Sequence, residues 1–217
     1  MMALEVKICG INSRTAARAA ADGGADLVGF VFYAPSPRYV TAAEAAELAH
    51  AIPEEHVSKV GLFVDVDDGT IEGVLTRVSL DMLQLHGNES PERVAEISAR
   101  FGLPVMKAIK LEIEEDLLAT HAFAAVADRL LFDAKPPDGL KGALPGGNAL
   151  AFDWTLLKGR EWPVPWMLSG GLTADNLAEA VRVSGARAVD VSSGVEDRRG
   201  HKDPARITAF LSAAAKL

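Results

Sequence analysis

Eight short apolar runs recur along the chain at intervals of about 21 to 36 residues, and this spacing constrains the fold more than any other feature. The runs begin near residues 5, 26, 59, 81, 104, 129, 165 and 187, and read EVKICG, DLVGFVF, KVGLFV, DMLQLHG, PVMKAIK, RLLFDA, PWMLSGG and AVDVSSG. Each interval has room for a strand, a loop, a helix and a second loop. Strands that alternate with helices pair in parallel through right-handed crossovers.

Helix-start signals lie between the runs, as this alternation requires. The TAAE segment at residues 41–44 has the form of a capping box, in which a threonine hydroxyl and a glutamate carboxylate each accept a backbone N–H. Further N-cap candidates, two of them followed by proline at the first helical position, are Ser90, Thr173 and Asp203.

Two architectures fit an alternating pattern of this kind. An open, doubly wound sheet usually has about five or six strands, whereas a (β/α)₈ barrel has eight. The eight evenly spaced units therefore predict a single (β/α)₈ barrel over residues 1–217, with eight parallel strands inside a ring of helices.

Charge and cysteine content exclude several classes of protein. Lysine and arginine number 22 against 30 acidic residues, so the formal net charge of −8 argues against a nucleic-acid-binding protein. A single cysteine allows no disulfide within the chain and no multi-cysteine metal site, and it fits a reducing compartment. The start MMALEV lacks a signal-peptide pattern, and no apolar run reaches the roughly 18 residues of a membrane span. We expect a cytoplasmic protein with no membrane partner.

The one cysteine, Cys9, ends the first run, at the rim of the predicted barrel. Strand alternation places Lys7 and Cys9 on one face and the apolar Val6 and Ile8 on the other, so the first two should point into the barrel. A nearby cation would favour the thiolate, which can accept a proton. Asp190 in the eighth run is an alternative partner for Lys7, and a lone cysteine can also be an inert buried filler.

Other candidate residues follow from the same alternation. Asp133 ends the sixth run and should face inward, where a buried carboxyl group can act as a general acid or simply cap a loop. Arg38 follows the second run and could hold a substrate carboxylate through two parallel bonds, or lie solvated at the surface. Gln84 and His86 point the same way from the fourth run and could line the pocket or belong to the core.

The loops after the seventh and eighth runs predict a phosphate site. Glycines let backbone amides approach an anion closely, and barrels commonly bind phosphate at these two loops. The alternative is that the glycines only make tight strand-to-helix turns. The residues concerned are Ser169, Gly170, Gly171, Ser192, Ser193 and Gly194.

With these residues in view, the chain resembles the phosphoribosylanthranilate isomerase family of tryptophan biosynthesis. The resemblance rests on an ordered set of motifs from residue 7 to about residue 203. They are KICG, GFVFYAPSPRYV, VGLFV, QLHG, LLFDA, PGGNALAFDW, LSGGLTADN and DVSSGVEDRRGHKD.

The resemblance implies an Amadori rearrangement of the small phosphosugar N-(5′-phosphoribosyl)anthranilate, with no metal and no cofactor. It implies that Cys9 is the general base, that Asp133 is the general acid and that Arg38 binds the anthranilate carboxylate. It also adds Gly147 and Asn148 to the loops that bind the phosphate. Relatives occur as monomers or homodimers, so either state is expected here.

Two other readings and two departures from the family pattern remain. A different phosphosugar isomerase on the same barrel, such as ProFAR isomerase, would use an aspartate where Cys9 stands, and a non-catalytic barrel would not need Cys9, Asp133 and Arg38 together.

Ala149 replaces a glycine that is frequent in the family, and the proline- and glycine-rich segment 135–149 is longer than in many relatives, which indicates an ordered or closing loop.

Overall fold

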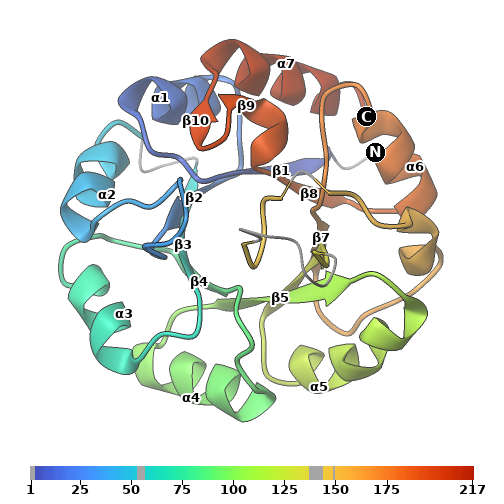
Figure 1. The fold of residues 1–217 in the computed structure, drawn as a ribbon, viewed down its shortest axis with the longest axis horizontal. Helices are drawn as coiled ribbons and strands as arrows, with labels where there is room; N and C mark the ends of the chain where they lie inside the picture. Colours follow the sequence, from blue (N-terminus) through green and yellow to red (C-terminus); the bar gives the residue numbers. More distant parts are fainter. Residues whose placement is uncertain (1–2, 53–56, 137–143, 149) are drawn as a thin grey trace.

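The computed structural model describes residues 3–52, 57–136, 144–148 and 150–217. Eight parallel strands form a closed barrel in sequence order, with helices around it (Figure 1). The barrel predicted from the spacing of the apolar runs is therefore confirmed. The strands are β1 (Glu5–Cys9), β2 (Leu27–Val31), β3 (Ser58–Phe63), β4 (Met82–Leu85), β5 (Val105–Leu111), β6 (Arg129–Ala134), β7 (Trp166–Leu168) and β8 (Ala188–Val191).

The outer ring consists mainly of α-helices. They are α1 (Arg14–Asp22), α2 (Ala42–Ala49), α3 (Asp68–Leu75), α4 (Pro91–Phe101), α5 (Thr120–Ala124), α6 (Leu177–Ser184) and α7 (Pro204–Ala214). Short 3₁₀ turns are η1 (Glu114–Ala119), η2 (Trp154–Leu157) and η3 (Ser193–Val195). Within the described residues only η2 lies between β6 and β7.

An antiparallel hairpin between β8 and α7 was not predicted from the sequence. It pairs β9 (Glu196–Arg198) with β10 (His201–Lys202), and it lies on the inner side of α7 (Figure 1). Gly200 turns the chain between the two strands at a φ of 81°. This hairpin brings charged side chains back to the rim of the barrel.

Most of the predicted helix starts are confirmed. The Thr41 hydroxyl accepts the Glu44 N–H and the Glu44 carboxylate accepts the Thr41 N–H, which completes the capping box. Ser90 and Asp203 accept backbone N–H groups at the starts of α4 and α7.

The prediction that Thr173 caps a helix is wrong. Helix α6 begins at Leu177, and Asn176 occupies the capping position. Thr173 and Asn176 instead exchange two hydrogen bonds, of 2.8 Å and 3.3 Å, in a turn before the helix. The side chain of Asn176 also donates to the Gly171 carbonyl at 2.9 Å, so this turn fixes the loop after β7.

Side chains inside the barrel form layers, as the alternation of each strand requires. The lower layers are Leu27, Val60, Met106, Ala108, Leu131, Met167 and Ala188. Cys9, Val31 and Leu62 form the layer above, at the carboxyl ends of the strands. Val6, Ile8, Leu130 and Phe132 belong to the larger core between the strands and the helices, so the predicted facing of β1 and β6 is confirmed.

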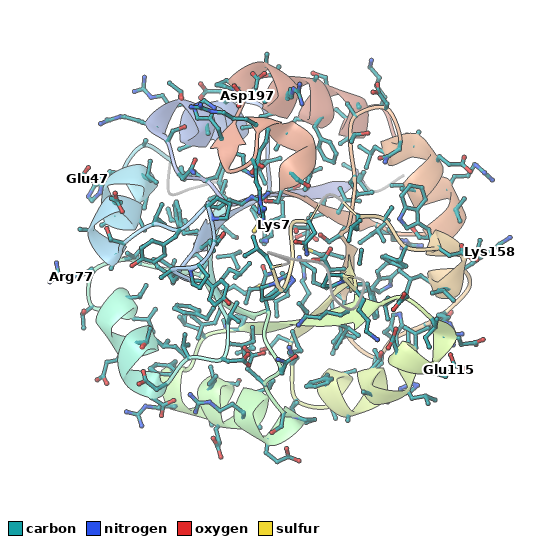
Figure 2. The ribbon with its side chains drawn as sticks, in the orientation of Figure 1. Lys7, Glu47, Arg77, Glu115, Lys158 and Asp197 are labelled. Atoms are coloured by element: carbon teal, nitrogen blue, oxygen red, sulfur yellow. The ribbon has the colours of Figure 1, made fainter. Side chains whose placement is uncertain are left out.

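Charged side chains lie both inside the barrel and at the outer edge of the molecule. Lys7 lies within the ring of strands, whereas Glu47, Arg77 and Lys158 lie at the outer edge (Figure 2). No helix in the described residues is long and apolar enough to cross a membrane.

Candidate active site

A cavity opens at the carboxyl ends of the strands and collects most of the predicted site residues. Eleven of them line it: Cys9, Arg38, His86, Asp133, Gly147, Asn148, Ser169, Gly170, Gly171, Ser192 and Ser193. Two predicted residues, Gln84 and Gly194, lie outside the lining. The chain of residues 144–148 passes over the centre of the ring (Figure 1).

The partner of Lys7 is Asp190 rather than a Cys9 thiolate. Lys7 Nζ donates to Asp190 Oδ1 at 2.8 Å, and both side chains are buried. The strand register explains the contact, because Lys7 and Asp190 are paired residues of β1 and β8. Burial opposes the charge on Lys7, but the Asp190 carboxylate, with a further contribution from Cys9, outweighs burial and holds the pKa of Lys7 above its ordinary value.

The surroundings of Cys9 favour the neutral thiol over the thiolate. Burial raises the pKa of the Cys9 thiol, and the opposing influence of Lys7 does not cancel this effect. The cation expected beside Cys9 is present and favours the thiolate, but burial and the Asp190 carboxylate favour the thiol more strongly. The thiolate is the form of Cys9 that can accept a proton.

A glycine on the neighbouring strand makes room for the thiol. Gly29 is paired with Cys9 across β1 and β2, and a Cβ at Gly29 would lie 2.8 Å from Cys9 Sγ. Real side chains do not approach so closely, so Gly29 lets the sulfur lie against the barrel wall. Sequence reasoning did not single out Gly29, because the role of this glycine depends on the register between two strands.

Asp133 lies at the end of a short chain of polar contacts. Gln84 Nε2 is 2.8 Å from His86 Nδ1, and His86 Nε2 is 3.1 Å from Asp133 Oδ2. The other carboxylate oxygen of Asp133 accepts the Ala134 backbone N–H at 2.9 Å. Gln84 is fully buried and supports His86, whereas His86 and Asp133 face the cavity.

The described part of the loop after β6 covers Asp133. Gly146 lies directly over His86 and Asp133, since a Cβ there would collide with His86 Nε2. The Asn148 side chain accepts the Leu144 N–H at 2.9 Å and donates to the Leu144 carbonyl at 2.7 Å, which closes residues 144–148 into a compact turn. Asn148 therefore uses its amide to shape the loop. The predictions about Ala149 and most of segment 135–149 lie outside the described residues.

Arg38 is buried at the rim and not solvated at the surface. Its Nε and Nη2 donate to Glu196 Oε1 and Oε2 at 2.7 Å and 3.0 Å, and Nη2 also donates to the Gly147 carbonyl at 3.1 Å. The stem of Arg38 crosses the turn after β1, where a Cβ at Gly10 would lie 2.7 Å from Arg38 Cδ.

Glu196 and Lys202 complete a buried cluster with Arg38 that sequence reasoning missed. Lys202 Nζ donates to Glu196 Oε1 at 2.7 Å and to the Ser192 carbonyl at 2.8 Å. Burial lowers the pKa of Lys202 to about 8, although Glu196 opposes this. Burial alone would raise the pKa of Glu196, but Arg38 and Lys202 reverse this and lower it. Both residues lie in the quoted DVSSGVEDRRGHKD motif, but only the hairpin brings them together.

The loops after β7 and β8 present backbone amides to the cavity. Gly170 and Gly171 have φ angles of 88° and 65°, which an L side chain rarely adopts. Among the described residues, the backbone N–H groups of Gly171 and Ser193 have no hydrogen-bond acceptor. Two such amides at one end of a cavity can bind an anion.

Two predicted phosphate residues serve the structure around these loops. The Ser169 hydroxyl donates to Asp190 Oδ2 at 3.1 Å, so Asp190 accepts bonds from both Ser169 and Lys7. Gly194 packs against the Leu172 carbonyl, where any Cβ would collide. Gly194 thereby holds the β7 and β8 loops together from outside the cavity.

The fold and the site define a class: a (β/α)₈ barrel whose cavity has a thiol and a carboxyl group on well-separated strands, and anion-binding loops after β7 and β8. Within the described residues, no cluster of three or more histidine, cysteine or acidic side chains could hold a metal ion.

Comparison with known proteins gives the family. Residues 6–213 match the profile of the N-(5′-phosphoribosyl)anthranilate (PRA) isomerase family, and the chain belongs to that family. The N-(5′-phosphoribosyl)anthranilate isomerase of Paramagnetospirillum magneticum is 60% identical over 213 residues, which cover 98% of each chain. That of Rhodospirillum centenum is 60% identical over 216 residues and covers both chains fully.

Solved structures agree in fold along the whole chain. Phosphoribosyl anthranilate isomerase from Thermotoga maritima superposes with a TM-score of 0.86 at 36% identity, covering 99% of this chain and 100% of that one. A phosphoribosyl anthranilate isomerase in complex with reduced 1-(o-carboxyphenylamino)-1-deoxyribulose 5-phosphate has a TM-score of 0.82 at 34% identity, with the same coverage.

Proposed function

We propose that this chain catalyses the Amadori rearrangement of N-(5′-phosphoribosyl)anthranilate to 1-(2-carboxyphenylamino)-1-deoxyribulose 5-phosphate in tryptophan biosynthesis. The observation that carries the proposal is that Cys9 and Asp133, from β1 and β6, line one cavity together with Arg38. Two strands separate β1 from β6 on one side of the barrel and four on the other, so the two groups approach a substrate from different sides. Family membership supports the same reaction.

Asp133 is the general acid of the first step. Its proton goes to the ribose ring oxygen, the bond from that oxygen to C1′ breaks, and the anthranilate nitrogen supplies the electron pair that forms a protonated imine. The turn at residues 144–148 covers the carboxyl group and restricts access of water. His86 contacts Asp133 Oδ2 and fixes the orientation of the carboxyl group.

Cys9 is the general base of the second step. The thiolate removes the C2′ proton, the C1′–C2′ double bond forms, and the electron pair of the imine returns to nitrogen. The resulting enolamine then tautomerises to the C2′ ketone. Because burial raises the pKa of Cys9, the thiolate is a stronger base than an ordinary cysteine once it forms.

Arg38 and the two glycine-containing loops bind the ends of the substrate. Arg38 is assigned to the anthranilate carboxylate, since Arg38 lines the cavity and its Nη1 has no hydrogen-bond partner among the described residues. The loops at residues 169–171 and 192–194 are assigned to the phosphate, with Gly171 and Ser193 as amide donors. Gly147 and Asn148, which the family resemblance adds to the phosphate loops, also line the cavity.

The proposed working state needs no metal or cofactor, because both proton transfers use protein side chains. A cytoplasmic location is proposed from the single cysteine. The proposed assembly is a monomer or a homodimer; one structural neighbour is described as a monomer generated from the dimeric enzyme of Thermotoga maritima. Light scattering of the purified protein distinguishes the two states.

A fluorescence assay tests the proposed reaction. Freshly made phosphoribosylanthranilate is mixed with the purified protein, and the loss of anthranilate-type fluorescence is followed. We expect rapid, enzyme-dependent loss, while ProFAR, offered as an alternative phosphosugar, stays unchanged. No turnover of phosphoribosylanthranilate by the wild-type protein would contradict the proposal.

A further inference from the structure

We propose that Glu196 is a positioning residue that fixes the Arg38 guanidinium for the carboxylate of the substrate. The proposal rests on the proposed function, because it takes the anthranilate carboxylate as the ligand of Arg38. Glu196 lines no part of the cavity and would act only through Arg38.

Glu196 holds one edge of the guanidinium and leaves another for a ligand. Its two carboxylate oxygens occupy Nε and Nη2 of Arg38, at 2.7 Å and 3.0 Å. Among the described residues, Nη1 of Arg38 has no hydrogen-bond partner, although the Arg38 side chain is nearly fully buried. A guanidinium is planar, so fixing the Nε–Nη2 edge also fixes the direction of Nη1.

Glu196 is itself immobilised, which makes it a suitable support. Oε1 accepts from Lys202 Nζ at 2.7 Å, Oε2 accepts from the Gly200 backbone N–H at 2.9 Å, and Arg206 donates to the Glu196 carbonyl at 2.5 Å. Only 4% of its side chain is exposed. An arginine on a flexible stem loses side-chain entropy when it binds a ligand, and a fixed partner removes part of that cost in advance.

The charge of the cluster fits a ligand with one carboxylate at this end. Arg38 and Lys202 are cations and share the single carboxylate of Glu196 among the described residues. The cluster therefore carries one uncompensated positive charge when both cations are protonated. A substrate carboxylate that contacts Arg38 would neutralise it.

Replacing Glu196 by glutamine distinguishes a positioning role from a purely electrostatic role. The two roles predict opposite changes in the affinity for a carboxylate. Glu196→Gln raises the positive charge beside Arg38 and would tighten carboxylate binding if charge alone mattered. Both oxygens of Glu196 accept from Arg38, so the glutamine NH₂ faces an Arg38 N–H in either orientation and one of the two bonds is lost. If Glu196 positions Arg38, carboxylate recognition weakens.

The experiment measures how much each protein prefers a ligand with the carboxylate. Dissociation constants are determined for reduced 1-(o-carboxyphenylamino)-1-deoxyribulose 5-phosphate and for the counterpart made from aniline, which lacks only the carboxylate. We expect Glu196→Gln to lower the preference of the wild-type protein by roughly tenfold or more, since a hydrogen bond to a charged group contributes about 1.5–3 kcal/mol and 1.4 kcal/mol is tenfold. A preference that is unchanged or larger in Glu196→Gln would overturn the proposal.

Two controls show that the effect passes through Arg38. Glu89→Gln makes the same change at another buried rim carboxylate, which pairs with Lys107 and not with Arg38, and it should leave the preference unchanged. In an Arg38→Met background, Glu196→Gln should change the preference no further. Binding of the aniline-derived ligand reports in every variant that the fold and the phosphate site persist.

The same measurement separates failure of this proposal from failure of the proposed function. A wild-type protein that binds neither ligand, or shows no preference for the carboxylate, would contradict the assignment of the substrate itself. A clear wild-type preference that survives in Glu196→Gln would contradict only the role of Glu196.

Discussion

Apart from the Lys7–Asp190 pair inside the barrel, two buried charge clusters lie near the rim, and they differ in their balance of charge. On the β4–β5 side, Lys107 pairs with Glu89 at 2.9 Å, one cation with one carboxylate. On the β8 and hairpin side, Arg38 and Lys202 share Glu196, two cations with one carboxylate. We call these clusters the rim pair and the rim triad.

In the rim pair, the charges and hydrogen-bonding groups are satisfied by other groups of the protein. Lys107 Nζ also donates to the carbonyls of Leu85 and Gly87, at 3.3 Å and 3.0 Å, and Glu89 accepts the Gly87 and Asp65 N–H groups. Burial lowers the pKa of Lys107, and Glu89 only partly opposes this. All of these bonds hold the loop that follows β4 and so hold His86, which begins it.

The rim triad instead retains one charge that the described part of the protein does not compensate. Uncompensated buried charge is costly to a fold and is found where a ligand supplies the missing partner. The difference teaches that burial alone does not make a charged cluster structural. The balance of charge separates the rim pair, which stabilises a loop, from the rim triad, which is prepared for an anion.

The largest predicted effects concern Cys9 and Asp133, the groups that transfer protons and belong to neither cluster. Cys9→Ser and Asp133→Asn should each lower kcat by several orders of magnitude, because each removes a general acid or base worth about 10² to 10⁴ in rate and blocks a required step. Affinity for the reduced product should stay within about threefold, since neither rim cluster is altered. Steady-state kinetics and ligand titration check both statements.

Near-full activity in Cys9→Ser would show that another group removes the C2′ proton. Near-full activity in Asp133→Asn would likewise remove the assignment of the acid. A loss of ligand affinity as large as the loss of kcat would place these residues in binding rather than in chemistry.

An intermediate effect concerns stability and contrasts the two clusters directly. Lys107→Met leaves the buried Glu89 carboxylate without its cation and should lower the free energy of unfolding by about 3–5 kcal/mol. Lys202→Met leaves Arg38 and Glu196 as a neutral pair and should cost only about 1 kcal/mol, mainly for the lost bonds to Ser192. Urea unfolding at neutral pH measures both values.

The double variant Lys107→Met/Glu89→Leu is the matched control for the rim pair. Removing both charges should recover much of the loss, because no unpaired carboxylate remains. Equal costs for Lys107→Met and Lys202→Met would remove the distinction between the two clusters.

The sequence predicted the barrel because its two signals, eight apolar runs and their spacing, are local and repeat along the chain. It also predicted which faces of β1 and β6 point inward, since alternation needs only neighbouring residues. It placed Cys9, Asp133 and Arg38 at one rim for the same reason, as strand ends of a parallel barrel meet there.

Features that depend on contacts between residues far apart in the chain could not be predicted from the sequence. Lys7 had two candidate partners until the register of β1 and β8 selected Asp190. Glu196 contacts Arg38 across 158 positions of the chain, through a hairpin with weak strand signals. The net effect on Cys9 could not be judged from Lys7 alone, because burial and Asp190 oppose the influence of that cation on the pKa of the thiol.

The smallest predicted effect is a pH dependence that arises in the rim triad. The pKa of Lys202 is lowered to about 8 by burial, with Glu196 and Cys9 opposing and Arg38 adding to the shift. A carboxylate bound at Arg38 favours the protonated amine and raises this pKa. Affinity for the reduced product should therefore fall as the pH rises through about 8, and binding near that pH should take up protons.

Proton uptake on binding tests the central claim, that the substrate's carboxylate supplies the charge that the rim triad lacks. Titration calorimetry at pH 8 in two buffers of different ionisation enthalpy measures it, and the ligand phosphate contributes little because its second pKa is about 6. We predict uptake of a fraction of a proton by the wild-type protein and none by Lys202→Met. Equal uptake in the two proteins, or no uptake in either, would contradict the account.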